Sequence, residues 1–412
     1  MDEPGFGGLL IVVAVSFAAP FLLGLAPRLR LPSVVFEIVA GIIIGPSVLG
    51  WVEVDVTISV LAIMGLAILL FLAGLEIDFG RLRGRLLGLA LLGWGLSFAI
   101  AVVVSLLLKT AGLVETPLLV AIILCATSLG VIIPVLKDVG ELTSKFGQLM
   151  LAAASIADFG AVILLSFFFS GEGGPGSTAI LLAVFVLLLV VTFFAVRGAE
   201  RSRRVEEDLL RLQDSSAQIR VRAAVVLMIA FVALAEGLGL EVILGSFAAG
   251  ALLSLLDQDR RMTHANFRLK LEAIGFGLFI PVFFVTSGIR FDLQALLDDP
   301  SNLVMVPIFL AALLAVRALP AITYRGFLGG RRATIAGVLQ ATSLPFIVAA
   351  TAIGQDLNLM DAAEASALIA AGLLSVLIFP ITGLTLLKRA MREEGAPIPE
   401  PTGTEPSPQM VM

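Results

Sequence analysis

Long apolar runs alternate with short charged or Gly/Pro-rich breaks along almost the whole chain. About 20 consecutive apolar residues form a helix that crosses the hydrocarbon core of a bilayer. We count thirteen such runs, one of which, the ninth, is short. Their approximate limits are 6–26, 33–51, 57–75, 86–108, 117–136, 147–170, 177–196, 221–239, 242–256, 271–288, 302–324, 333–354 and 362–387. The pattern predicts an all-α polytopic membrane protein with 13 transmembrane helices.

The composition of the 412 residues agrees with this pattern and excludes several kinds of function. Hydrophobic residues make up 59% and charged residues 14%, so a soluble domain of this composition would lack the polar surface it needs. One Cys and one His are too few for a disulfide, most metal sites and most nucleophilic enzymes. We therefore expect no enzyme, no cofactor and no nucleic-acid partner, and we interpret His264 as a solvated loop residue.

Lys and Arg residues are divided unequally between the two sets of alternate loops. Cytoplasmic loops carry an excess of these residues. Of the 27, one set of loops holds 23 and the opposite set holds only Lys109 and Arg290. A miscounted run would scramble this alternation. We therefore expect a multi-pass protein of the plasma membrane, surrounded by lipid, with its N-terminus outside and its C-terminus in the cytoplasm.

Two short motifs recur at nearly the same separation in the two halves of the chain. CATSLG (125–130) returns 215 residues later as QATSLP, and AGLEIDF (73–79) returns 214 residues later as SGIRFDL. Because this separation spans seven helices, an odd number, the second half should run upside down, as in secondary transporters. The expected layout is a first six-helix repeat at 1–170, a linker helix at 177–196, a cytoplasmic loop at 197–220, a second, inverted six-helix repeat at 221–387 and a disordered cytoplasmic tail at 388–412.

A single carboxylate, Asp158, lies at the middle of the apolar run 147–170. An ionisable side chain at the centre of a bilayer costs about 3 kcal/mol or more and is rare without a function. We interpret Asp158 as a proton or cation site inside the membrane. The alternative is an aspartate that only holds helices together through neighbouring hydroxyl groups.

The two runs that contain the recurring ATS motif also contain helix-breaking residues, Gly130 and Pro134 in one and Pro345 in the other. Broken helices in a membrane are tolerated where they line a protein cavity, because their freed backbone groups need partners. We therefore predict two crossed discontinuous helices that form a polar pocket around Asp158. The alternative is that ATS is a small-residue packing motif. The hydroxyl groups expected at the pocket belong to Thr127, Ser128, Thr342 and Ser343.

Arg317 is a second charge deep inside an apolar run, 302–324, and it needs a negative partner or a wet cavity. Asp158 is its first candidate partner and Glu37 its second. Alternatively, Arg317 is a permanent counter-charge that takes no part in transport. Glu37, near the start of the second run, lines an access funnel or lies at the membrane interface.

Six segments resemble the monovalent cation:proton antiporter superfamily, in particular its branch of bacterial Na+/H+ exchangers and glutathione-gated K+ efflux antiporters. The resemblance covers nearly the whole chain. It implies a homodimer in which a core domain with two crossed broken helices moves like an elevator against a dimerisation domain. The segments are FEIVAGIIIGPSVLG (36–50), LLFLAGLEIDF (69–79), ATSLG (126–130), ASIADFG (154–160), GSFAAGALLS (245–254) and FFVTSGIRFD (283–292).

The resemblance also implies roles for single residues. Asp158 matches an acid that alternately binds a cation or a proton, and Thr127 and Ser128 match hydroxyls that help complete the cation shell. Arg317 matches a basic residue that balances the charge of the site. Ala157 departs from the family, since other members carry a second acid, Asn or Gln at this position. A lone carboxylate holds one proton or one monovalent cation, so we expect electroneutral exchange.

These observations predict a secondary active transporter that exchanges Na+ or K+ for H+. The alternative is a Na+-coupled symporter of a small organic anion on a related inverted-repeat fold. A channel would need a continuous wet path and uncoupled conduction. Hydroxyl-lined sites bind Na+, K+ and Li+, so the sequence leaves the choice among these ions open.

Overall fold

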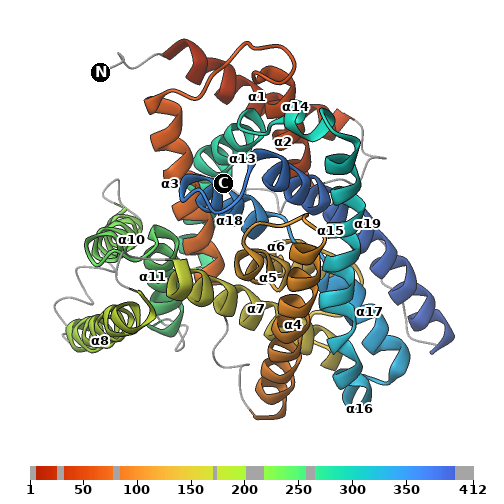
Figure 1. The fold of residues 1–412 in the computed structure, drawn as a ribbon. Coiled ribbons are helices and arrows are strands. Elements are labelled where there is room, and N and C mark those ends of the chain that lie inside the picture. Colours follow the sequence, from red (N-terminus) through yellow and green to blue (C-terminus); the bar gives the residue numbers. More distant parts are fainter. Residues whose placement is uncertain are drawn as a thin grey trace, which may run out of the picture.

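The computed structural model describes residues 6–25, 32–77, 84–169, 174–200, 218–256 and 265–394, and the regular structure in these segments is helical (Figure 1). Each of the thirteen predicted runs overlaps at least one helix. The first half contains α1 (Phe6–Leu25), α2 (Ser33–Ile44), α3 (Val56–Leu75), α4 (Gly84–Thr110), α5 (Pro117–Leu124), α6 (Leu129–Asp138), α7 (Lys145–Phe169) and α8 (Gly174–Glu200). The second half contains α10 (Ile219–Gly237), α11 (Val242–Leu256), α12 (Ala265–Ile274), a π-helix (Gly275–Phe279), α13 (Ile280–Ile289), α14 (Leu293–Leu297), α15 (Pro300–Ala318), a 3-10 helix (Pro320–Tyr324), α16 (Arg325–Leu328), α17 (Gly330–Gln340), α18 (Pro345–Asp356) and α19 (Ala362–Glu393).

Seven helices of the described residues are long and apolar enough to cross a membrane, and the bent pair of α17 and α18 makes an eighth. Shorter apolar helices cover Phe6–Leu22, Ser33–Ile44, Pro117–Ile133 and Val242–Leu256. Helices suit apolar runs because their backbone groups are satisfied within the segment. The count of thirteen spans stays a prediction.

One helix is shorter than its apolar run because of proline. The run 33–51 predicts a single long helix, but α2 ends at Ile44. Gly45 adopts an extended conformation directly before Pro46. The proline ring disfavours a helical conformation in the residue that precedes it, so the helix stops there.

The last helix is longer than predicted. We expected a disordered tail from residue 388, but α19 continues to Glu393. Arg389 and Glu393 form an ion pair one turn apart, which supports the final turn. Residues 395–412, most of the predicted loop 197–220, and His264 lie outside the described residues.

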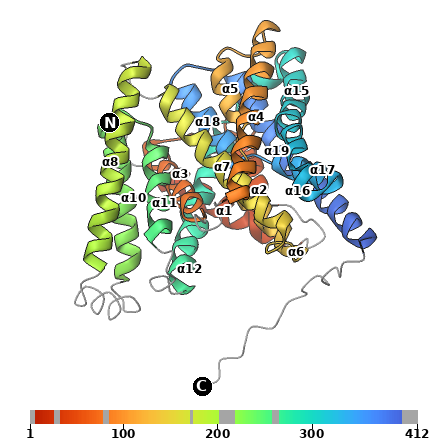
Figure 2. The ribbon, with the colours of Figure 1, turned by 90° about the horizontal axis from the view of Figure 1, so that it is seen from below.

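The helices pack in two groups, and each group draws on both halves of the sequence. In the first group, α1, α2, α3 and α10 to α13, α3 packs on α11 and α2 packs on α13. In the second group, α4 to α7 and α14 to α19, α4 packs on α5 and α7, and α15 packs on α17 and α19. Both views show α8 and α10 on one side of the molecule and α4, α15 and α17 on the other (Figure 1 and Figure 2). The groups meet where α7 contacts α11.

Glycines permit the closest helix crossings in the first group. Gly74 of α3 and Gly250 of α11 each lie against the main chain of the opposite helix. Gly288 of α13 and Gly41 of α2 make the same reciprocal contact. A methyl group at any of these positions would collide with a carbonyl oxygen of the facing helix. Small residues at crossings let helix backbones approach closely, as is typical in membranes.

Candidate functional site

Two helical runs are interrupted near their middle, and the two interruptions are in contact. Residues 125–128 separate α5 from α6, and residues 341–344 separate α17 from α18, whose axes differ by 42°. The amide of Ser128 in the first gap donates a 2.8 Å hydrogen bond to the carbonyl oxygen of Thr342 in the second. The contact joins the two copies of the recurring motif.

Proline coincides with only one of these interruptions. Pro345 occupies the first position of α18, where its missing N–H leaves no helical bond unmade. Gly130 and Pro134, expected to break the other run, lie inside α6 and therefore after the gap. The first gap instead begins at Cys125, which is fully buried, and is held by hydrogen bonds to the second gap and to the end of α17. The position of this break was therefore predicted a few residues too late.

A cavity of about 240 Å³ lies at this crossing, between the two helix groups. Residues of α2, α3 and α11 line it from the first group, and residues of α6, α7 and α18 line it from the second. The cavity therefore brings together four of the site residues predicted from sequence, and it adds one that was not predicted. Its polar lining includes Asp158, Thr127, Ser128, Ser343 and Glu76.

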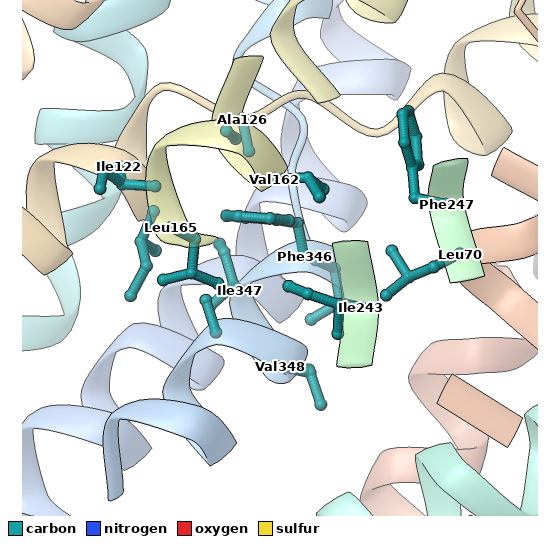
Figure 3. Close-up of a cluster of buried hydrophobic side chains, with 14 of the residues drawn as sticks. Leu70, Ile122, Ala126, Val162, Leu165, Ile243, Phe247, Phe346, Ile347 and Val348 are labelled. Atoms are coloured by element: carbon teal, nitrogen blue, oxygen red, sulfur yellow. The ribbon is translucent and has the colours of Figure 1, made fainter. Parts of the chain in front are cut away.

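Apolar side chains from both groups form the rest of the wall. They include Leu70 of α3, Val162 of α7, Phe247 of α11 and Phe346 of α18. Figure 3 shows these four among the buried hydrophobic side chains of the region. Few polar groups compete in such surroundings, so each charge interacts more strongly than it would in water.

Asp158 lies on α7 and is partly exposed. The main-chain amides of Thr127 and Leu129 interact with its carboxylate. These amides belong to the gap before α6 and to the first residue of that helix. The N-terminus of a helix offers unpaired N–H groups and a partial positive charge, which favour an anion. Asp158 is therefore positioned where the broken helix stabilises a negative charge.

The four predicted hydroxyl groups differ in their partners. Thr127 Oγ1 donates a hydrogen bond of 2.9 Å to the carbonyl oxygen of Gln340, and its lone pairs stay available. Ser128 and Ser343 line the cavity, whereas Thr342 does not. The hydroxyl groups of Thr342 and Ser343 are buried without a hydrogen-bond partner. Buried hydroxyls are rarely left unpaired, so the Ser343 hydroxyl at the wall of the cavity is a candidate ligand.

Arg317 is buried on α15, with 2% of its surface exposed, and its partners differ from those expected. It donates hydrogen bonds to Ser97 Oγ at 3.1 Å, to Gln340 Oε1 at 3.3 Å and to the Gln340 carbonyl oxygen at 3.4 Å. It forms no ion pair with Asp158 or Glu37, both of which lie in the described segments. The carbonyl end of a helix carries a partial negative charge, and Gln340 ends α17, so the guanidinium is stabilised there.

Of two glutamates in the first helix group, one lines the cavity and the other does not. Glu37 is buried in α2 but is not among the residues that line the cavity, so its role in a funnel stays a prediction. Glu76, at the end of α3, does line it and forms an ion pair with Arg268 of α12 at 3.4 Å. Arg268 also pairs with Glu272 at 2.8 Å. Glu76 was missed because a carboxylate at the end of a span is not unusual, although it lies within a recurring motif.

The polar groups of the cavity are oxygen ligands. Carboxylate, hydroxyl and carbonyl oxygens bind hard cations, and carbonyl oxygens can replace the hydration shell of an alkali ion. No group of three or more His, Cys, Asp or Glu side chains that would suit a metal ion occurs in the described segments. The oxygen ligands of the cavity suit a monovalent cation or a proton.

Comparisons with known proteins match most of this chain to one family. A family model described as sodium/hydrogen exchanger, transmembrane, matches residues 13–389. YjbQ of Bacillus subtilis is 33% identical over 96% of this chain, which spans 65% of YjbQ. The Na+/H+-K+ antiporter GerN of Bacillus cereus is 32% identical over 65% of this chain and 67% of its own length.

A solved structure has the same fold over nearly the whole chain. The sodium proton antiporter MjNhaP1 from Methanocaldococcus jannaschii matches with a TM-score of 0.63 and 16% sequence identity. The match covers 92% of this chain and 98% of that one. Together with the several apolar helices, the family match shows that this chain is an integral, multi-pass membrane protein of the sodium/hydrogen exchanger family.

Proposed function

We propose that this protein exchanges Na+ for H+ across a membrane and that Asp158 binds the two ions in turn. The observation that carries the proposal is the position of Asp158, in a cavity where two broken helices meet and beside main-chain amides at the start of α6. The names of the relatives GerN and MjNhaP1 support the same exchange. The relatives do not support the alternative of a symporter for an organic anion.

Coupling follows from the charge of one carboxylate. Moving a bare carboxylate through the hydrocarbon region is prohibitively costly, so the site moves only when a proton or a cation neutralises it. The hydroxyl groups of Ser343, Thr127 and Ser128 then complete the cation shell beside Asp158, since all four residues line one cavity. GerN is named for K+ as well as Na+, so we extend the proposal to K+ as a second cation.

The two helix groups support an elevator-type movement. The cavity is lined by both groups, so a shift of the second group, which carries Asp158, would expose the site alternately to each side. The packing also supports the inverted repeat. If α2 corresponds to α11 and α3 to α13, the contact of α3 with α11 is repeated as the contact of α13 with α2. Thirteen spans, an outside N-terminus, a homodimer and a place in the plasma membrane belong to the same proposal.

We infer that the exchange is electroneutral. Ala157 leaves Asp158 without an adjacent acid. The second carboxylate of the cavity, Glu76, is already paired with Arg268 and lies on the other helix group. One proton therefore replaces one cation. In proteoliposomes, the initial rate should not change when an ionophore sets the membrane voltage to positive or negative values.

The substitution Asp158→Asn tests the whole proposal. In proteoliposomes with a preset pH gradient, adding Na+ should dissipate the gradient with the wild type but not with D158N. Asp299→Asn is a matched control, because Asp299 is exposed and caps α15 through the amide of Ser301, a role that Asn can fill. Undiminished Na+-dependent exchange by a folded D158N protein would refute the proposal.

A further inference from the structure

Arg317 is a buried cation, and its hydrogen bonds within the described segments go to neutral groups. Its three hydrogen bonds go to the Ser97 hydroxyl and to the two oxygens of Gln340. A buried charge is usually paired with an opposite charge, because desolvation costs several kcal/mol per ion. An anion, Asp158, is present in the same helix group, and yet the two do not form an ion pair.

Gln340 is the residue that connects Arg317 with the cavity. It is the last residue of α17 and is 2% exposed. Its carbonyl oxygen accepts hydrogen bonds from Arg317 and from Thr127, which lines the cavity. Its side-chain amide contacts the sulfur of Met150 on α7 at 3.7 Å, and α7 also carries Asp158. Gln340 therefore touches the arginine, the first gap and the helix of the aspartate.

We propose that Gln340 is a positioning residue for cation exchange, whose side-chain oxygen holds Arg317 at the end of α17 and away from Asp158. The inference rests on the proposed function of Asp158. A guanidinium and Na+ seek the same carboxylate, so an untethered Arg317 competes with the transported ion. The tether removes this competitor, while the positive charge stays near the site.

The decisive variant is Gln340→Leu, which removes the side-chain oxygen and keeps the main-chain oxygen that Thr127 needs. Released from one of its partners, Arg317 can approach Asp158, and the KM for Na+ in proteoliposomes should rise at least about tenfold. The maximal rate per folded transporter should change much less. Gln340→Glu restores an oxygen acceptor at the same place and should return the KM toward the wild-type value.

Two further variants separate positioning from packing. Ser97→Ala removes the other side-chain partner of Arg317, at 3.1 Å, without changing Gln340, so by the same argument its KM for Na+ should also rise. In an Arg317→Gln background, where no guanidinium competes, Gln340→Leu should no longer raise the KM. This double-mutant comparison isolates the interaction between the two residues. Gln340→Met serves in place of Gln340→Leu where the leucine variant does not fold.

Three results would overturn the inference: an unchanged KM in Q340L, a loss of maximal rate in both Q340L and Q340E with an unchanged KM, or the same rise in KM with and without Arg317. None of these affects the proposed function. That function fails on a different result, namely the absence of Na+-dependent proton exchange by the wild type or its persistence in D158N.

Discussion

A partly exposed carboxylate and a buried guanidinium lie in one helix group of this protein without forming an ion pair. The carboxylate of Asp158 interacts with amides at the start of α6, and the guanidinium of Arg317 binds oxygens at the end of α17. Each charge therefore uses the oppositely charged end of a broken helix. The helix ends therefore stabilise these two charges, a role that an oppositely charged side chain fills in an ion pair. The carboxylate consequently stays available for an exchangeable ion.

At the scale of single residues, the unpaired hydroxyl of Ser343 gives a direct prediction. If the hydroxyl binds the transported cation, Ser343→Ala should raise the KM for Na+ about tenfold and leave the protein folded. Ser166→Ala is a matched control, because Ser166 is also buried without a partner but does not line the cavity. Proteoliposome kinetics with increasing Na+ check both variants. Equal KM values for the two would argue against Ser343 as a ligand.

The sequence identifies residues that are unusual in a membrane-spanning segment. It does not identify residues whose roles depend on contacts with another side chain. Asp158 stands out because a charge in mid-membrane is costly, and Ser343 because its motif is repeated. Glu76 ends a span, where a carboxylate is common. Gln340 is an uncharged residue whose importance lies in what it holds. Only the folded chain reveals that Arg317 binds Gln340 rather than an acid.

At the scale of elements, apolar patterning predicted which segments form helices, and backbone chemistry decided where they stop. Thirteen runs overlap helices, but α2 ends early at Ile44, and the first gap precedes Gly130. The end of α2 follows from the local sequence, because Pro46 disfavours a helical conformation at Gly45. The first gap depends on hydrogen bonds between distant segments, for example from Ser128 to Thr342, and no local pattern contains this information.

The reciprocal glycine contacts predict which crossings tolerate no added atom. Gly288→Ala should destabilise the protein by about 1–3 kcal/mol, because the new methyl group meets the main chain of α2, which cannot move as a side chain can. Gly88→Ala in α4 meets nothing within 4 Å and should be neutral or slightly stabilising. Thermal unfolding in detergent measures both. Equal melting temperatures for G288A and wild type would show that the crossing is looser than described.

For the molecule as a whole, ion pairs tie the ends of the second helix group together. Arg332 of α17 binds Glu141, between α6 and α7, at 3.2 Å and Glu394, after α19, at 2.6 Å. Arg331 binds Glu393 in the same region. In the elevator-type movement that we propose, the helix group that contains Asp158 moves as one body. These pairs link both broken helices to α19 and so favour such movement.

One of these pairs predicts a dependence of stability on pH. The guanidinium of Arg332 hydrogen-bonds Glu394 and holds the pKa of that carboxyl below its ordinary value. A lowered folded-state pKa contributes stability above the unfolded-state pKa, about 4.3, and this contribution is lost as the pH falls through the folded-state pKa. Arg332→Gln should therefore lower the melting temperature slightly at pH 7, and the difference should shrink in acid. The exposed Arg392→Gln should show no such trend.

The burial of Cys125 in the first gap gives the protein a native chemical reporter. It is the sole cysteine of the chain, it is fully buried, and its thiol donates to the carbonyl oxygen of Ile122 at 3.2 Å. A maleimide should therefore label the resting protein slowly, since water has to enter the crossing before the reagent does. Conditions that favour an open gap should increase the rate of labelling, and no engineered thiol is needed. Mass spectrometry of the labelled protein would measure this rate and so report how often the crossing opens.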